Sequence, residues 1–518
     1  MGTYIENIVD EHEHIFHSQY SPVPVPDNVT LPEFVLQNVE LYGDKVAFVD
    51  AESGKGVTYS EVARDIHRFS KALRSLGLRK GSVVIVVLPN VVEYAIIALG
   101  IMDSGGVFSG ANPASHTSEI KKQAESADAK LIVTNSTTHE KVKNLGLPVI
   151  VLGDELVEDA MNWNKLLEAA DRAGDDLMKE PINQNDLCAM PFSSGTTGMS
   201  KGVMLTHRNL VANLCSTLFS VVPEMIGKVT TLGLIPFFHI YGITGICCAT
   251  IRNKGKVVVM GRYDLKTFLN ALITHEVTFA PIVPPIILGL VKNPIVDEFD
   301  LSKLKLQAIM TAAAPLAPEI LTSFQHKFPG VVVQEVVPSS FYNISKSLPR
   351  NTPGELCVRS QCVMQGYYKQ VDETAQTIDK NGWLHTGDIG FIDDEENVFI
   401  VDRIKELIKY KGFQVAPAEL EAILLSHSSV EDAAVVPLPD EEAGEIPAAS
   451  VVLSKGAKET EEDMMNYVAS NAAHYKKVRV VHFVEAIPKS PSGKIMRRLI
   501  KEKMVEKIKE NSLTKSNT

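Results

Sequence analysis

A glycine-rich run at residues 193–202, Ser-Ser-Gly-Thr-Thr-Gly-Met-Ser-Lys-Gly, places the strongest constraint on the fold. Glycine readily adopts positive φ, so such a run can turn several backbone N–H groups toward one centre. With the hydroxyl groups and the ammonium of Lys201, these N–H groups favour a polyphosphate ligand. Apolar stretches at residues 187–191 and 203–205 flank the run, which predicts strand, loop and strand, with a helix from about His207. A flexible Gly/Ser/Thr linker is the alternative, but a linker rarely lies between two apolar strands.

Apolar and amphipathic segments alternate along most of the chain. The continuous apolar run at residues 82–88 predicts a buried strand, and the periodicity at residues 31–42 and 59–76 predicts two helices. Further strands are expected at residues 130–134 and 148–152. This alternation favours α/β layers with largely parallel sheets. A chain of 518 residues is too long for a single core, so two or more domains are expected.

The composition changes near residue 400, where four basic side chains fall within nine positions. A compact α/β pattern of just over one hundred residues follows. We therefore expect one domain at residues 1–402 and a second at residues 403–518. Such a charged run is often only a solvated face, but here apolar residues interrupt it. The basic residues are Arg403, Lys405, Lys409 and Lys411.

Charge and composition exclude several classes of function. The net charge of −12 disfavours nucleic acid as the main partner. No apolar run is long enough to predict a transmembrane segment. We expect a cytoplasmic protein, because the sequence shows neither a secretory signal nor the peroxisomal C-terminal tripeptide. The six cysteines have neither metal-ligand nor disulfide spacing, which predicts buried thiols and no metal site.

Two further residues stand out by their surroundings. His239 lies in Pro-Phe-Phe-His-Ile-Tyr-Gly, and a single histidine among aromatic residues is usually part of a core. Lys494 ends Pro-Lys-Ser-Pro-Ser-Gly-Lys, a rigid turn that would alone be read as a surface loop. Each motif has an ordinary structural interpretation when it is taken by itself.

Together, these motifs resemble the adenylate-forming acyl-CoA ligases over nearly the whole chain. The sequence is similar in particular to the plant 4-coumarate–CoA ligase-like branch. Within that branch, Leu-Ile-Pro-Phe-Phe-His-Ile-Tyr-Gly at residues 234–242 and Met-Thr-Ala-Ala-Ala-Pro-Leu at residues 310–316 resemble the pollen-wall (sporopollenin) fatty acyl-CoA synthetases. The resemblance implies a large N-terminal domain of stacked α/β subdomains and a small, mobile α/β C-terminal domain.

The resemblance also implies roles for residues that match the family's motifs. A glycine at position 245, where hydroxycinnamate ligases commonly carry a larger serine, implies a roomier acyl slot. The ATP- and AMP-binding positions are Ser193, Ser194, Gly195, Thr196, Thr197, Lys201, Asp388, Arg403 and Lys494. The acyl-adenylate and substrate positions are Tyr241, Gly245, Ala313, Glu335, Lys405 and Lys409. The CoA positions are Arg262, Lys411 and Gly412, and the catalytic positions are Lys494, Lys409 and His239.

The implied reaction uses ATP with Mg²⁺, and CoA as a second co-substrate. A carboxylate attacks the α-phosphate and expels pyrophosphate, and the CoA thiol then displaces AMP from the acyl adenylate. The resemblance implies a medium- or long-chain fatty acid, or a hydroxy fatty acid, as the substrate. The alternatives are a hydroxycinnamate–CoA ligase and a catalytically impaired protein that only binds nucleotide or acyl ligands. The expected partners are these small molecules and not nucleic acid, and association with other lipid-pathway enzymes is left open.

One segment departs from the family pattern. After Gln334 and Glu335 the family continues with Tyr-Gly-x-Thr-Glu and a few dozen further residues, which complete the large domain's sheet. Residues 336–346 read Val-Val-Pro-Ser-Ser-Phe-Tyr-Asn-Ile-Ser-Lys instead, and the likeness resumes near Ser347. Because both sides match well, an internal loss explains the difference better than divergence does. We therefore expect an incomplete N-terminal domain near residues 336–346.

Overall fold

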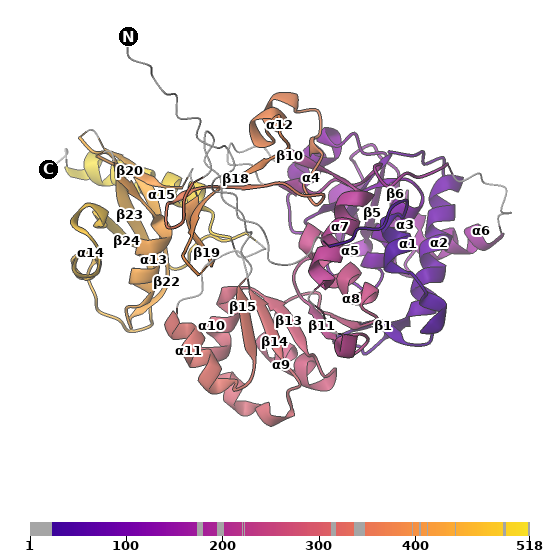
Figure 1. Ribbon diagram of the computed structural model, residues 1–518, viewed down its shortest axis with the longest axis horizontal. Helices are drawn as coiled ribbons and strands as arrows, with labels where there is room; N and C mark the ends of the chain where they lie inside the picture. Colours follow the sequence, from indigo (N-terminus) through magenta and orange to yellow (C-terminus); the bar gives the residue numbers. More distant parts are fainter. Residues whose placement is uncertain are drawn as a thin grey trace, which may run out of the picture.

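The computed structural model describes residues 23–172, 180–193, 201–219, 221, 223–311, 318–335, 348–395, 397–403, 406–411, 413–440, 442–490 and 494–515. The side chains at positions 318, 319, 335, 401–403, 413, 414 and 508–515 are not part of this description. The strands of these residues form four sheets with helices packed beside them (Figure 1). The expected α/β architecture, with a large N-terminal part and a small C-terminal part, is confirmed.

A nine-stranded sheet lies in the N-terminal part of the chain, with the order β17-β10-β8-β4-β3-β5-β6-β7 and β9 paired to β10. The strands from β8 to β7 run parallel, which explains why β3 is apolar and buried at every residue. The bounds are β3 Val83–Val87, β4 Val107–Ala111, β5 Leu131–Asn135, β6 Val149–Leu152, β7 Met161–Asn162, β8 Leu187–Ala189, β9 Phe192–Ser193, β10 Lys201–Thr206 and β17 Gly366–Tyr367.

The helices of this part begin where their sequences supply caps. Thr58 and Glu61 form a capping box at the start of α2, and Thr206 caps α7, which begins at His207 as expected. The helix α3 is buried at all ten residues, as its uniformly apolar sequence requires. The bounds are α2 Tyr59–Ser75, α3 Tyr94–Asp103, α4 Thr117–Ser126, α5 Ser136–Val142, α6 Trp163–Arg172, α7 His207–Leu218 and α12 Val371–Thr377.

The helix predicted at residues 31–42 is wrong in its length. The structure has α1 (Leu31–Val35) and then a separate 3₁₀ turn, Val39–Leu41. Asn38 lies between them with φ of 60°, a left-handed conformation that ends an α-helix. The periodic apolar pattern is thus shared by two short elements rather than one long helix.

A seven-stranded sheet lies beside the first, with the order β15-β14-β13-β11-β12-β1-β2 (Figure 1). β15 is at its edge, pairs only with β14 among the described strands, and leaves Val332 56% exposed. The strands are β1 Val46–Asp50, β2 Gly56–Thr58, β11 Thr230–Gly233, β12 Lys256–Val259, β13 Phe279–Ile282, β14 Ala308–Thr311 and β15 Val332–Glu335. The helices are α8 Ala249–Arg252, α9 Leu265–Thr274, α10 Pro284–Lys292 and α11 Pro318–Lys327.

A small three-stranded sheet precedes the C-terminal domain. It contains β16 (Gly354–Val358), β18 (Leu384–Ile392) and β19 (Val398–Arg403) in that order. Asp402, the expected boundary residue, lies inside β19, where it pairs with Ile389. The next described strand, β20 (Ile408–Tyr410), belongs to a different sheet, so the chain changes sheets between Arg403 and Ile408.

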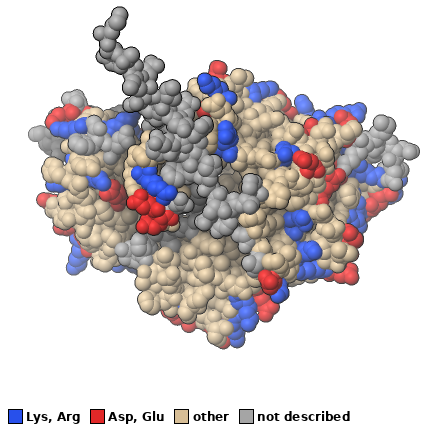
Figure 2. Space-filling view, in the orientation of Figure 1, with Lys and Arg blue, Asp and Glu red and all other residues tan. Residues whose placement is uncertain are grey.

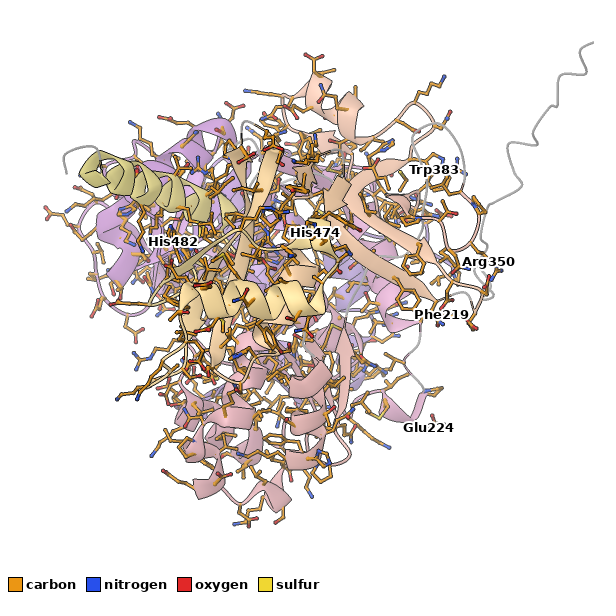
Figure 3. All side chains as sticks on the ribbon, turned by 90° about the vertical axis from the view of Figure 1, so that its left-hand side faces the viewer. Phe219, Glu224, Arg350, Trp383, His474 and His482 are labelled. Carbon is orange, nitrogen blue, oxygen red and sulfur yellow. The ribbon has the colours of Figure 1, made fainter. Side chains whose placement is uncertain are left out.

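The C-terminal domain has a five-stranded sheet with its own apolar core. Figure 3 views this domain from outside, with His474 and His482 on it and Trp383, which directly precedes β18, nearby. The remaining bounds are β21 Phe413–Val415, β22 Val430–Asp440, β23 Gly444–Leu453, β24 Val480–Phe483, α13 Pro417–Leu425, α14 Glu461–Asn471 and α15 Arg497–Lys515.

The described surface carries charges of both signs. On the face shown in Figure 2, basic and acidic side chains are interspersed rather than gathered into one field of a single sign. Such a face offers no extended basic track for a nucleic acid. Among the described helices, none has the length and apolar character needed to cross a membrane.

A buried arginine ties the C-terminal domain together. Arg497, at the start of α15, donates from Nε to Glu406 Oε2 at 2.8 Å and from Nη2 to Glu421 Oε2 at 3.0 Å. It also donates to the carbonyl oxygen of Val435 on β22 at 2.8 Å. The carboxylate of Glu421 is only 7% exposed, so this arginine neutralises a buried charge.

We predict that Arg497→Gln lowers the free energy of unfolding of the C-terminal domain by about 3–5 kcal/mol, because it leaves the buried Glu421 without its partner. The measurement is native-state hydrogen exchange of peptides covering α13 and β22. The matched control is Arg498→Gln, at a neighbouring side chain that is 71% exposed and should cost less than about 1 kcal/mol. Equal losses from both substitutions would contradict the assigned role of Arg497.

Candidate active site

A cavity of about 1440 Å³ lies where the N-terminal sheets and the three-stranded sheet approach one another. Its walls come from the end of β4, from α7, from β11, β13 and β14, and from β18. A further wall is the π-helical segment η3 (Gly242–Cys248), which continues directly into α8. The cavity is large enough for a nucleotide together with a second small molecule.

The structure brings some of the sequence-predicted residues to this cavity and leaves others elsewhere. Those that line it are Ser193, His239, Tyr241, Gly245 and Asp388. Those that are described but not part of its lining are Lys201, Arg262, Lys409, Lys411 and Lys494. Ser194, Gly195, Thr196, Thr197, Ala313, Lys405 and Gly412 lie outside the described residues, as do the side chains of Glu335 and Arg403.

Asp388 is placed by an irregularity in the pairing of β16 with β18. Cys357 pairs with His385 and Glu355 pairs with Ile389, so residues 386–388 form a bulge in β18. Gly387 supports this bulge with φ of 74°, which glycine tolerates. On the other side, Asp388 is the direct partner of Arg403 on β19. Two residues predicted to hold the nucleotide are therefore cross-strand neighbours.

Lys201 is held by an ion pair. Its ammonium contacts the Glu373 carboxylate on α12, and it lies 5.2 Å from the centroid of the Tyr367 ring. Lys201 is the first residue of β10, directly after the glycine-rich run. An anion bound by that run would compete with Glu373 for the same ammonium group.

The segment that precedes η3 presents His239 and Tyr241 to the cavity. Burial lowers the pKa of His239, so its imidazole is neutral at pH 7. The Nδ1 atom accepts a hydrogen bond from the backbone N–H of Tyr241 at 3.2 Å, which leaves the proton on Nε2. Burial raises the pKa of Tyr241 to about 12, so the phenol is also neutral.

The space beside Gly245 is already filled. A Cβ atom at this position would lie 2.5 Å from Cε2 of the Tyr241 ring. The glycine therefore allows the tyrosine to pack against η3. The prediction that Gly245 itself widens the acyl slot needs correction, because the room that it leaves is taken by a side chain of the same wall.

The predicted C-terminal lysines lie on the small domain. The exposed Lys409 on β20 donates its backbone N–H to Glu445 Oε2 at 2.9 Å, and the ammonium of Lys411 forms an ion pair with Glu442. The carbonyl oxygen of Lys494 accepts a hydrogen bond from the Ser490 N–H at 2.8 Å. None of these three lysines lines the cavity in this arrangement of the domains.

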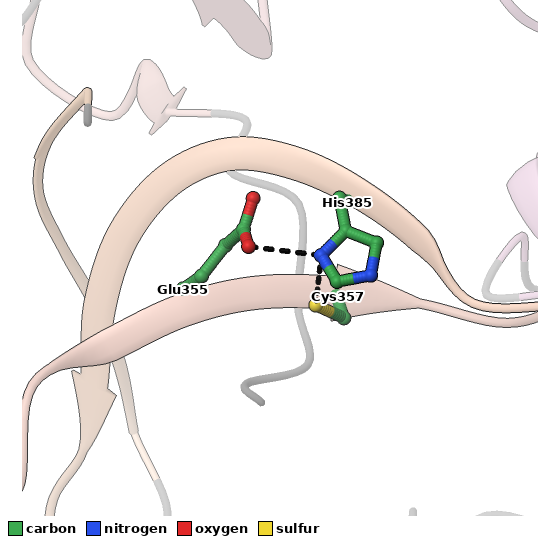
Figure 4. A group of neighbouring side chains, drawn as sticks. All are labelled: Glu355, Cys357 and His385. Carbon is green, nitrogen blue, oxygen red and sulfur yellow. Dashed lines mark hydrogen bonds and ion pairs between the residues drawn. The ribbon is translucent and has the colours of Figure 1, made fainter. Parts of the chain in front are cut away.

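Sequence reasoning missed one group of side chains at the base of the bulge: Glu355, Cys357 and His385 (Figure 4). His385 Nδ1 lies 2.9 Å from Glu355 Oε2 and 3.4 Å from Cys357 Sγ. Burial raises the pKa of Cys357 to about 12, and the nearby carboxylates of Glu355 and Asp379 add to this. Cysteine spacing does not reveal the group, because two strands far apart in the sequence assemble it. The Glu-x-Cys pattern, which places both side chains on one face of a strand, is the only local signal.

Comparisons with known proteins agree with this geometry. Residues 35–337 match the AMP-binding enzyme family, and residues 419–494 match the AMP-binding enzyme C-terminal domain. The chain is 66% identical to 4-coumarate–CoA ligase-like 1 of Arabidopsis thaliana over 532 aligned positions, covering 96% of this chain and 98% of the relative. It is 38% identical to 4-coumarate–CoA ligase 1 of Petroselinum crispum, covering 93% and 96%. The crystal structure of ATP-bound MatB from Rhodopseudomonas palustris has the same fold, with a TM-score of 0.81 at 24% identity over 92% of this chain and 99% of that chain.

The chain therefore belongs to the AMP-binding enzyme family, whose members share this adenylate-forming fold. Within that family it falls in the plant 4-coumarate–CoA ligase-like branch, as the sequence resemblance predicted. It is by class an AMP-forming acid–CoA ligase, for which ATP and CoA are co-substrates.

We predict that Gly245→Ala destabilises the protein by about 1–3 kcal/mol, because the added Cβ overlaps the Tyr241 ring. The measurement is the melting temperature. Gly289→Ala is the matched control, because a Cβ there meets its nearest atom at 3.7 Å. The loss should largely disappear when Gly245→Ala is made in a Tyr241→Ala background, whereas additive losses would show that the two residues are independent.

Proposed function

We propose that this ligase activates a medium- or long-chain fatty acid, including hydroxylated forms. The observation that carries the proposal is the wall of the cavity beyond Tyr241. This wall continues along η3 and α8, where Gly245, Ala249, Thr250 and Asn253 line the cavity. An extended acyl chain would have this wall to pack against in addition to the part of the cavity beside Tyr241.

The chemistry of the deep end supports the same class of substrate. Side chains of Leu218, Met225, Val229 and Ala249 give the wall an apolar character. Thr250 and Thr231 also line it, with their hydroxyl oxygens 2.8 Å apart in a hydrogen bond. A hydroxyl group on the acyl chain could join this pair, so the deep end accommodates hydroxy fatty acids without burying an unpaired polar group.

For the first half-reaction, we propose that residues 193–201 hold the ATP phosphates and that Asp388 and Arg403 hold the ribose and its neighbourhood. ATP enters as its magnesium complex, so the ion is part of the substrate. Negative charge grows on the phosphoryl oxygens as the acid attacks, and the ammonium groups of Lys494 and Lys201 would stabilise it electrostatically. Neutral His239 and Tyr241 would line the path of the incoming carboxylate.

This role of Lys494 requires movement of the small domain. The change of sheets between Arg403 and Ile408 is the proposed hinge, with residues 1–402 and 403–518 as the two bodies. One orientation would bring Lys494 to the cavity for adenylation. A second would bring Lys405, Lys409, Lys411 and Gly412 there, and with Arg262 these would serve thioester formation with CoA.

A second candidate function is binding of nucleotide or acyl ligand without efficient catalysis. The 66% identical relative aligns over 532 positions, more than the 518 residues of this whole chain, so it has residues without a counterpart here. The family match ends at residue 337, where the departing segment begins. Both observations support loss of the block that contains the Tyr-Gly-x-Thr-Glu motif. Residues 336–346 themselves lie outside the described residues.

The substrate proposal is tested with a panel of acids on a version with the family-type segment restored. We expect kcat/KM for acyl-CoA formation to rise from hexanoate to palmitate by up to about fourfold per methylene, the equivalent of ~0.8 kcal/mol for each buried CH₂. Thr250→Val is the matched variant, which should reduce activity with ω-hydroxy acids and spare the unsubstituted acids. A preference for 4-coumarate over every fatty acid would refute the proposal.

We predict that the chain as it stands has ATP–pyrophosphate exchange near background and melts at a lower temperature than the restored version. The reason is the loss of an adenylate contact and of strands expected to cover neighbouring sheet edges. Hydrogen exchange in β22 and β23 should be the same in both versions, because the C-terminal core is uninterrupted. Robust exchange by the unrestored chain would mean that residues 336–346 replace the lost contacts.

A further inference from the structure

Three potential metal-ligand atoms of different kinds converge on one point in the three-stranded sheet. Cys357 on β16 is the direct cross-strand partner of His385 on β18, and Glu355 precedes Cys357 by two residues on the same strand. Side chains two residues apart in a strand share a face, so all three reach the same side. The oxygen, sulfur and nitrogen atoms all lie within 4.8 Å of one another (Figure 4).

The separations suit a small tetrahedral ion. Zinc binds sulfur at about 2.3 Å and nitrogen or oxygen at about 2.0–2.2 Å, so its ligand atoms lie roughly 3.3–3.7 Å apart. Sγ of Cys357 and Nδ1 of His385 are already 3.4 Å apart. Nδ1 of His385 and Oε2 of Glu355 are 2.9 Å apart, so a small outward shift of the carboxylate would complete the set.

The surroundings hold the ligands in place. The Glu355 carboxylate accepts at Oε1 from the Gly387 N–H at 3.1 Å, which orients its other oxygen toward His385. Cys357 is 1% exposed, and the side chain of Glu355 is 9% exposed. A thiolate and a carboxylate around a divalent cation would make the buried group neutral, which low-dielectric surroundings favour.

The geometry does not fit a thiol nucleophile activated by histidine. In such a triad the thiol and the carboxylate contact opposite nitrogens of the imidazole ring. Here both contact Nδ1 (Figure 4). A shared cation explains this arrangement, because it attracts all three donor atoms to one centre.

We propose that Glu355, Cys357 and His385 form a Zn²⁺ site of mixed oxygen, sulfur and nitrogen ligands. Within the described part of the chain, no fourth His, Cys, Asp or Glu joins the group, so water would take the remaining position. The bound ion would join β16 to β18 directly below the bulge that carries Asp388. Its role is to fix that bulge, and it is independent of which acid the ligase activates.

The test is the zinc content of the purified full chain. The protein is incubated with zinc under reducing conditions, dialysed against metal-free buffer, and analysed by inductively coupled plasma mass spectrometry. We expect about one zinc ion per chain, and at least about tenfold less in Cys357→Ser and in Glu355→Gln. Cys215→Ser on α7, outside both the group and the cavity lining, is the matched control and should retain the ion.

Cobalt substitution separates ligand loss from misfolding. The unmodified chain loaded with Co²⁺ should show a thiolate-to-cobalt charge-transfer band, and this measurement needs no variant to fold. Addition of zinc should also raise the melting temperature of the unmodified chain and of Cys215→Ser, but not that of Cys357→Ser. Absence of the charge-transfer band, or zinc retention no greater in the unmodified chain than in Cys357→Ser, would overturn the proposal and leave a Glu355–His385 hydrogen bond.

Discussion

The position of the candidate active site depends on the irregular pairing of β16 with β18. If β16 and β18 paired in regular register, each residue of one strand would face one residue of the other, and β18 would have no bulge at Asp388. The three-residue bulge at 386–388 instead turns the chain, and the hydrogen bond from Thr386 Oγ1 to the Leu356 carbonyl at 2.8 Å fixes it. The chain continues from β18 through β19 to the C-terminal domain, so the distortion that places Asp388 in the cavity wall lies one strand before the change of sheets.

Close packing forms the wall of the cavity beside Tyr241. The absence of a side chain at Gly245 matters because it admits the Tyr241 ring, not because it leaves empty space. The depth of the cavity comes from residues further along, where η3 passes into α8. The width of the cavity is therefore set beside Gly245 and Tyr241, and its length is set where η3 passes into α8. A substitution in one of these two places need not change the other dimension.

Much of the fold was predictable from local sequence. The uniformly apolar β3 and the capped helices α2 and α7 lie where periodicity places them, since their sequences determine burial and capping locally. The short length of α1 was not predictable, because Asn38 adopts a left-handed conformation that interrupts the periodic apolar pattern of residues 31–42. For the site, motifs indicated Ser193, His239, Tyr241, Gly245 and Asp388. They could not show that Tyr241 packs on Gly245, or that Cys357 faces His385, since those contacts depend on strand pairing and tertiary packing.

The ion pair between Lys201 and Glu373 has a consequence for selectivity among anions. In the unliganded protein this ammonium group already has a counterion. A ligand that binds through Lys201 would compete with Glu373 for this ammonium group, so a single weak contact from a free phosphate ion gains little net energy there. A polyphosphate, which would meet several donors of the glycine-rich run at once, offsets that cost. The ion pair therefore disfavours any anion that would contact Lys201 alone.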